Sequence, residues 1–238
     1  MDTNGNLYTF IYASVLVIVV AAALSFTALQ LQPLQEMNVK NEKMQNILTS
    51  VQVESTAETA NEIFTKYITK SFVINSEGKE LEGKQAFDIN LKQEYKKKLE
   101  DRVLPLYEAT LDDGSNILVI PLTGKGLWGP IWGYIALKSD MNTVFGAVFD
   151  HKGETPGLGA DINARWFEEP FSGKTIYEDG KLIGIRVHKG GKGAAEAAKD
   201  TEHGVDAISG GTITSKALEE MVFDCISSYK SYLENNKK

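Results

Sequence analysis

An uninterrupted apolar run near the N-terminus constrains this chain more than any other feature of its sequence. No charged residue occurs between Thr3 and Gln35, and the stretch from Leu7 to Leu29 is almost entirely apolar. A helix of roughly 23 residues is about 34 Å long, enough to cross a hydrocarbon core of about 30 Å. Tyr8 and Tyr12 suit the aromatic anchors found at membrane interfaces. The sequence therefore predicts one transmembrane helix within residues 1–35.

A cleaved signal peptide is the competing interpretation of this run. Such a peptide has a positively charged start, a short apolar core and small residues at the cleavage site. The segment before the run, MDTNGN, has no Lys or Arg, and the run is longer than a usual core, but residues 21–25 (AAALS) offer small side chains. The flanking charges are Asp2 on one side and Glu36, Lys40 and Lys43 on the other, so they do not decide the orientation.

The remaining chain is expected to form a helical stalk and then one α+β domain. Apolar residues between Gln30 and Lys70 recur at helical spacing. Later runs rich in β-branched and aromatic residues alternate with turns, which favours an antiparallel sheet with interspersed helices. We expect an anchor at 1–35, a juxtamembrane stalk at 36–70 and a mixed antiparallel-sheet domain at 71–238. The expected strands are a hairpin at Ser71–Leu81, then Leu104–Leu111, Ile117–Leu122, Trp132–Lys138, Thr143–Asp150, Thr175–Tyr177 and Leu182–Val187.

Two further helices are predicted in this domain. The first is Asp161–Phe171, whose apolar residues have a helical period. Between the two helices, the glycine-rich run Lys189–Ala197 is expected to be a surface loop. The final helix has the strongest pattern, because its apolar residues recur at i, i+3, i+4 and i+7. These residues are Leu218, Met221, Val222, Cys225, Ile226, Tyr229 and Leu233. Cys225 lies on the apolar stripe, which predicts a buried core residue and not a reactive thiol.

Composition and spacing exclude several classes of function. A net charge of −7 and a pI near 5.1 argue against nucleic acid as a partner. One Cys and three scattered His residues provide no disulfide, zinc ribbon or other metal-ligand spacing. Ser172–Thr175 resembles the end of a P-loop, but Glu168 stands where a glycine is required. Gly191–Gly193 lacks the third glycine of a dinucleotide fingerprint, so we expect no NADH site on this chain.

A loop rich in glycine and hydroxyl groups leads directly into the final helix. Its sequence, residues 206–215, is DAISGGTITS. The simpler interpretation is helix capping by Thr214 or Ser215. The functional interpretation is an anion site, because free backbone N–H groups and the helix dipole favour a phosphate there. Gly210 and Gly211 would let a bulky group approach the backbone closely.

Two other segments combine glycine with proline or tryptophan. His151–Gly159 (HKGETPGLG) is either a simple turn or a loop whose backbone lies against a planar ligand. Pro121–Tyr134 (PLTGKGLWGPIWGY) is either core packing with sharp bends or an aromatic wall built from Trp128 and Trp132. Each pattern leaves both interpretations open.

Taken together, these segments resemble the FMN-binding domain family. In that family a flavin transferase attaches FMN, through a phosphoester, to the threonine of an Asp-x-x-Ser-Gly-Ala-Thr motif. The resemblance implies Thr212 as the acceptor, with Thr214 as the nearest competing hydroxyl, and Gly211 replaces the usual alanine. The implied FMN-binding residues are Trp128, Glu154, Thr155, Gly157, Leu158, Gly159, Asp206, Ser209, Gly210, Gly211, Thr212 and Thr214.

The stretch GKGLWGPIWGY is similar to the NqrC subunits of sodium-translocating NADH:quinone reductases. RnfG, the related protein of the Rnf electron-transport complex, is an alternative, as is a membrane-anchored binding module without a redox group. The first resemblance implies an electron-carrying flavoprotein that relays electrons toward quinone in step with sodium export, while NADH is oxidised elsewhere in the complex. It also implies a single-pass protein of the bacterial inner membrane, a periplasmic domain, and other reductase subunits and a flavin transferase as partners.

Overall fold

The computed structural model describes residues 5–237 and divides the chain into two compact units, Met1–Lys43 and Met44–Lys238. Helix α1 (Asn6–Ser50) runs through the first unit and ends in the second. Within the described residues, α1 is the one helix that is long and apolar enough to cross a membrane. Its most apolar window has a mean hydropathy of 2.4, and none of that window is buried by the rest of the chain. The length and composition therefore agree with the predicted span.

The expected stalk at 36–70 is not one separate helical segment. The last turns of α1 and the residue that follows contribute Met44, Ile47, Leu48 and Val51 to the buried core of the second unit, as their apolar spacing allows. The chain then turns, forms the short helix α2 (Ala60–Tyr67) and enters strand β1 at Ile68. The prediction of helix up to Lys70 is therefore wrong for its last three residues, which belong to the sheet instead.

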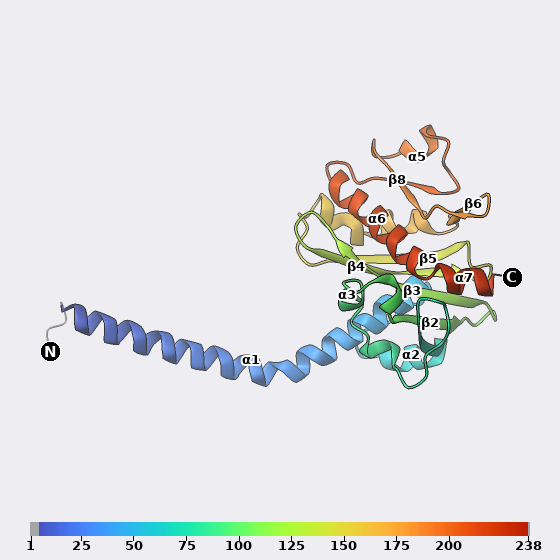
Figure 1. Cartoon of the computed structure of the whole chain (residues 1–238). Helices are drawn as coiled ribbons and strands as arrows, with labels where there is room; N and C mark the ends of the chain where they lie inside the picture. The colour runs from blue at the N-terminus through green and yellow to red at the C-terminus, as the bar shows by residue number, and fades with distance from the viewer. Residues whose placement is uncertain (1–4, 238) are drawn as a thin grey trace. The chain divides into compact units, whose positions relative to one another are not determined.

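A five-stranded antiparallel meander forms the centre of the second unit (Figure 1). The strands follow one another in chain order: β1 (Ile68–Ile74), β2 (Leu104–Thr110), β3 (Asn116–Lys125), β4 (Pro130–Lys138) and β5 (Val144–His151). This confirms the strands predicted at 104–111, 117–122, 132–138 and 143–150. Of the hairpin predicted at Ser71–Leu81, the first half belongs to β1, and the return is a single bridge between Ile74 and Glu80. Two small sheets follow, an antiparallel pair β6 (Tyr177–Glu178) and β7 (Lys181–Leu182), and a parallel pair β8 (Arg186–His188) and β9 (Gly204–Asp206).

Both faces of the meander are buried. Successive residues of one strand alternate between two apolar clusters: Leu118 and Ile120 join one cluster, and Val119 joins the other. Helix α6 (Thr212–Ser228) covers the first face, while the end of α1 and Phe64 of α2 cover the second (Figure 1). Burial of each large apolar side chain contributes about 1.5–3 kcal/mol, so the two clusters are the main source of stability.

One predicted helix is less regular than its periodicity suggests. Asp161–Phe171 is divided into η3 (Gly159–Asn163), α4 (Arg165–Glu168) and η4 (Glu169–Phe171). Ala164 is extended, and Pro170 has no N–H to continue the α-helical hydrogen bonds. The remaining short helices are η1 (Ala86–Asp88), α3 (Leu91–Glu94), η2 (Leu99–Asp101) and α5 (Ala194–Ala197). Helix α5 lies inside the run predicted to be a loop.

The final helix is interrupted at Tyr229 and continues as α7 (Lys230–Asn236). Its apolar stripe is buried as predicted, including Leu218, Cys225 and Leu233. The Cys225 Sγ lies 3.4 Å from the Thr123 carbonyl oxygen, and burial raises the pKa of this thiol to about 11. Cys225 is therefore a core residue and stays protonated at neutral pH.

Removal of residues 1–31 should give a chain that stays in aqueous solution. The deleted part contains the apolar window, and α1 is the one span candidate that the described residues contain. The measurement is partition between buffer and detergent micelles, compared with the full chain. A truncated chain that still enters the detergent phase would contradict a single anchor.

Glu168 should make the domain less stable as pH rises from about 4.5 to about 7. Burial raises the pKa of Glu168 to about 7, and the Asp150 charge adds to this, while a hydrogen bond from the Phe149 N–H opposes it. Within that window the folded chain holds a proton that the unfolded chain has lost, so folding becomes less favourable as pH increases.

Glu168→Gln should remove this pH dependence because the amide stays neutral and its oxygen can still accept from Phe149. We expect the free energy of unfolding of the variant to exceed that of the parent by on the order of 1 kcal/mol at pH 8, a value discounted for partial solvent exposure. At pH 4 we expect no difference. Denaturant unfolding of both proteins at the two pH values checks this. The same difference in unfolding free energy between the two proteins at pH 4 and at pH 8 would contradict this role of Glu168.

Candidate functional site

The segment between β9 and α6, residues 207–211, connects the small parallel sheet to the helix that carries Thr212. Its turn is closed by a hydrogen bond from the Gly211 N–H to the Ile208 carbonyl, 3.0 Å, and Gly210 has a φ of +75° that favours glycine. Helix α6 begins at Thr212, and Gly211, its N-cap residue, provides no side-chain cap. Neither Thr214 nor Ser215 caps α6 itself: Thr214 Oγ1 donates to Glu154, and Ser215 Oγ accepts from the backbone N–H of Ile208, which precedes the helix.

The four hydroxyl side chains of this region differ in accessibility. Ser215 is fully buried; its Oγ accepts from the Ile208 N–H and donates to the Gly211 carbonyl. Thr214 is 2% exposed and donates to Glu154. Ser209 is exposed and Thr212 is half-buried. Two hydroxyls are thus engaged inside the protein, and two remain open to a reagent in solution.

Glu154 joins three segments that are far apart in the sequence. Its side chain is 4% exposed. One carboxylate oxygen, Oε1, accepts from the Trp128 N–H at 2.8 Å, and the other, Oε2, accepts from Thr214 Oγ1 at 2.6 Å. The loop after β5, the tip of the β3–β4 hairpin and the first turn of α6 therefore meet at one carboxylate. Glu154 faces inward, so its role is to position these segments.

The rest of the loop at 154–159 packs against the residues before α6. A Cβ at Gly210 would lie 2.6 Å from Leu158 Cδ2, and one at Gly211 would lie 2.9 Å from the Leu158 carbonyl carbon. A Cβ at Gly159 would collide with Thr214 Oγ1 and would lie 2.7 Å from Glu154 Oε2. A close approach to Gly210 and Gly211 was expected for a bulky group. In the structure, Leu158 of the same chain fills the space beside both glycines.

Thr155 and Gly157 shape this loop. The Thr155 carbonyl accepts from the N–H groups of Leu158 and Ala160, and the Gly157 N–H donates to Asp161 Oδ1 at 3.0 Å. Gly157 has a φ of +74° and open space around its Cα, so glycine is required there for backbone conformation and not for close approach.

Three exposed apolar side chains belong to the segments that meet at Glu154 and at the beginning of α6. Trp128 at the hairpin tip is 70% exposed, Leu158 is 39% exposed and Ile213, next to Thr212, is 64% exposed. Trp132, the second tryptophan of the expected wall, is half-buried in β4. We call Trp128, Leu158 and Ile213 the apolar patch. It presents one indole and two aliphatic side chains to solvent.

A cavity of about 720 Å³ opens beside this region. Its lining is mainly apolar and includes Trp166, Phe167, Ala207 and Ser209. The cavity reaches Ser209 of the acceptor loop, but Thr212 does not line it.

Asp206 holds the neighbouring glycine-rich segment. Its carboxylate accepts from the N–H groups of Gly193, at 2.6 Å, and Ala195, at 2.8 Å. Asp206 therefore orders the start of α5 through these bonds, although its motif suggested a place in the acceptor loop.

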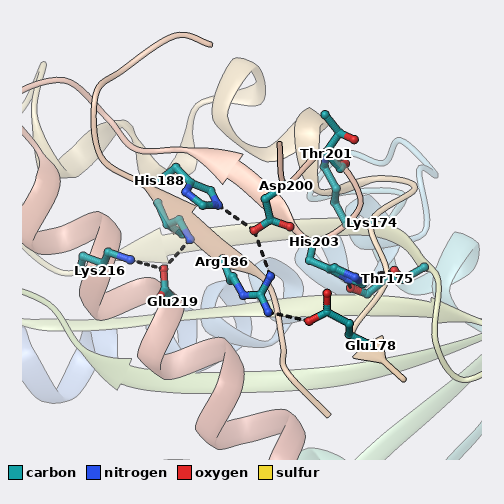
Figure 2. A network of polar contacts seen from close by, with 11 residues as sticks. Lys174, Thr175, Glu178, Arg186, His188, Asp200, Thr201, His203, Lys216 and Glu219 are labelled. Atoms are coloured by element: carbon teal, nitrogen blue, oxygen red, sulfur yellow. Dashed lines mark hydrogen bonds and ion pairs between the residues drawn. The ribbon is translucent and has the colours of Figure 1, made fainter. Parts of the chain in front are cut away.

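A polar network stabilises the β8–β9 sheet that leads into this region (Figure 2). Asp200 accepts from His188 Nε2 at 2.7 Å and lies 3.3 Å from Arg186 Nη1. Burial would raise the pKa of Asp200, but these hydrogen bonds outweigh it and hold the pKa below its usual value. From α6, Glu219 accepts from the Val187 N–H and from Lys216. The network connects the small sheet to the helix that begins at Thr212.

Sequence reasoning did not place Gly126 or Ile213 in this site, and it gave Ser215 only a capping role. Gly126 leaves room for Glu154, since a Cβ there would lie 2.6 Å from Oε1. Ser215 closes the turn before α6, and Ile213 completes the apolar patch. Only Ile213 had a sequence signal, because it is an apolar residue outside the buried stripe of its helix.

Comparison with known proteins places this geometry in a family. The FMN-binding domain family matches residues 126–227, which include the hairpin tip, the loop at 154–159 and most of α6. The curated NqrC subunit of the Na(+)-translocating NADH-quinone reductase from Haemophilus ducreyi is 28% identical, over 92% of this chain and 87% of the relative.

Solved structures agree with this assignment. The structure of the NqrC subunit from Parabacteroides distasonis has a TM-score of 0.75 and 37% identity, and the match covers 85% of this chain and 96% of that one. The NqrC structure from Shewanella oneidensis has a TM-score of 0.68 and 28% identity, over 83% and 98% of the two chains. This chain therefore belongs to the family of NqrC subunits of the Na(+)-translocating NADH-quinone reductases, with an FMN-binding domain.

Proposed function

We propose that this chain carries FMN on Thr212 through a phosphoester. The observation that carries the proposal is the accessibility of the hydroxyls. Thr212 is half-buried at the first position of an uncapped helix, while the hydroxyls of Thr214 and Ser215 are buried and hydrogen-bonded. The first N–H groups of a helix lack intrahelical partners, and the helix dipole stabilises a nearby anion by about 0.3–1 kcal/mol.

The attachment reaction requires a flavin dinucleotide donor and the flavin transferase. Thr212 Oγ1 forms the new bond to the FMN phosphorus, and the phosphoanhydride bond of the donor breaks. The nucleoside monophosphate leaves, and the threonine proton passes to solvent or to a base of the transferase. No electrons change hands in this step, and the added mass equals FMN minus water.

The apolar patch is proposed to hold the isoalloxazine ring. Trp128, Leu158 and Ile213 expose flat or aliphatic surface around the helix start, and burial of that surface against a ring is favourable. Bound FMN supplies reversible electron transfer in one- or two-electron steps. The protein residues supply orientation: Glu154 fixes the Trp128 backbone and the first turn of α6 relative to each other.

We further propose that the flavin relays electrons toward quinone within a sodium-translocating reductase. The names of the relatives support this and favour NqrC over RnfG. NADH would be oxidised elsewhere in the complex, and the other membrane subunits of the reductase would be partners of this chain. The α1 helix would cross the bacterial inner membrane once, with the domain and the flavin transferase on the periplasmic side.

Thr212→Ala should abolish covalent FMN and leave the fold intact. The substitution removes the proposed nucleophile, and Thr212 is only half-buried. Flavin fluorescence of the denatured protein on a gel, together with its intact mass, measures the attachment. Thr212→Ser keeps a hydroxyl at the same atom and is the matched control. Full fluorescence of the alanine variant would contradict attachment at Thr212.

Gly211→Ala should shift the flavin absorption spectrum while leaving FMN attached. The φ of −101° at Gly211 suits any residue, but the new Cβ would lie 2.9 Å from the Leu158 carbonyl carbon and 3.0 Å from its oxygen. The loop at 154–159 must then move by a few tenths of an ångström, and Leu158 moves with it. The change in unfolding free energy should stay within about 1 kcal/mol.

Gly153→Ala is the matched control for this prediction, because a Cβ at Gly153 meets nothing within 4 Å. Absorption spectra of the three flavinylated proteins give the comparison. Identical spectra for the Gly211 variant and the parent would argue that Leu158 does not contact the ring.

A further inference from the structure

We infer that Glu154 is a specificity-determining residue for flavin attachment, because it withholds the Thr214 hydroxyl from the flavin donor. This inference rests on the proposed attachment to Thr212. Thr214 is two residues away and has the same functional group, so the transferase meets two chemically identical candidates. In the folded chain, burial and hydrogen bonding distinguish them.

The first element of discrimination is the hydrogen bond from Thr214 Oγ1 to Glu154 Oε2, 2.6 Å long. To form a phosphoester, a threonine oxygen must approach phosphorus and release its proton. The Thr214 proton points at a carboxylate oxygen, and the side chain is 2% exposed, so a phosphate has no path to it. Attack by Thr214 requires this bond to break and the loop at 154–159 to move away.

The second element is the immobility of the Glu154 carboxylate. Its other oxygen accepts from the Trp128 N–H at 2.8 Å, and the backbone N–H of Glu154 donates to His151 Nδ1 at 3.2 Å. Gly126 and Gly159 lie directly against the two oxygens, so the carboxylate fills the space that their missing side chains leave. A 4% exposed side chain held at both oxygens cannot rotate away from Thr214 without breaking the Trp128 contact.

Thr212 lacks such a restraint. It is half-buried, and no hydrogen bond engages its hydroxyl in the part of the chain that the structure describes. Ser215 is withheld in a different way, through the Gly211 carbonyl and the Ile208 N–H. Glu154 therefore affects whether FMN is attached to Thr212 or to Thr214. It does not affect Ser215, whose hydroxyl is held by other groups.

The test uses the full chain, coexpressed with its flavin transferase, in a Thr212→Ala background. We compare T212A, T212A/E154A and T212A/E154Q, and locate FMN by mass spectrometry of the peptide that spans residues 206–215. FMN on Thr214 should rise at least about tenfold in the double variants over T212A, a change that corresponds to about 1.4 kcal/mol. Glutamine preserves the side-chain volume and keeps one acceptor oxygen for the Trp128 N–H, which can only donate. Its NH2 group then faces Thr214 and cannot accept the hydroxyl proton, so E154Q tests the loss of that acceptor if the alanine variant does not fold.

The triple variant T212A/T214A/E154A is the matched control. The amount of FMN on its 206–215 peptide should fall back to the amount found for T212A. If a folded double variant carries FMN on Ser209 alone, or no FMN, then Glu154 does not govern the choice and the inference is overturned. The parent chain separates this result from the proposed function: FMN on its Thr212 confirms the attachment, and its absence there overturns both.

Discussion

Burial of both faces of the five-stranded meander is the constraint on which the other elements depend. Each strand alternates apolar side chains between two clusters, so each face needs its own cover. The α6 helix supplies one cover, and the end of α1 with α2 supplies the other. Because α6 must lie on the sheet to bury its stripe, its first residue, Thr212, is brought to the end of the β3–β4 hairpin. The position of the proposed acceptor thus follows from core packing.

The site itself depends on a polar contact inside an otherwise close-packed junction. A buried carboxylate is unfavourable unless its oxygens are satisfied, and Glu154 satisfies both with groups from two other segments. Loss of either partner would leave an unpaired buried oxygen, so the three segments are held together as one unit. This arrangement places the exposed Trp128 ring and the Leu158 side chain on rigid supports, as a site that must orient a flat cofactor requires.

The small parallel sheet has a supporting role in this design. Asp200, which precedes β9, binds Arg186 and His188 of β8. Asp206, at the end of β9, accepts hydrogen bonds from the start of α5. These contacts are made by polar side chains and backbone N–H groups close to the residues that precede Thr212. The turn at Gly210 is therefore held from one side by this sheet and from the other by Leu158.

The sequence by itself determined the apolar span, four of the five strands of the meander, the buried stripe of the last helix and the resemblance to the FMN-binding domain family. Those features are local: a period of two or 3.6 residues, an apolar run, or a contiguous motif. Only the tertiary structure decided where α1 joins the core, where the helix predicted at 161–171 breaks, and that Glu154 faces inward to Thr214 and Trp128. The partners of Glu154 are 26 positions away, at Trp128, and 60 positions away, at Thr214. Such hydrogen bonds leave no periodic signal in the sequence, because their partners meet only when packing of the sheet and α6 brings them together.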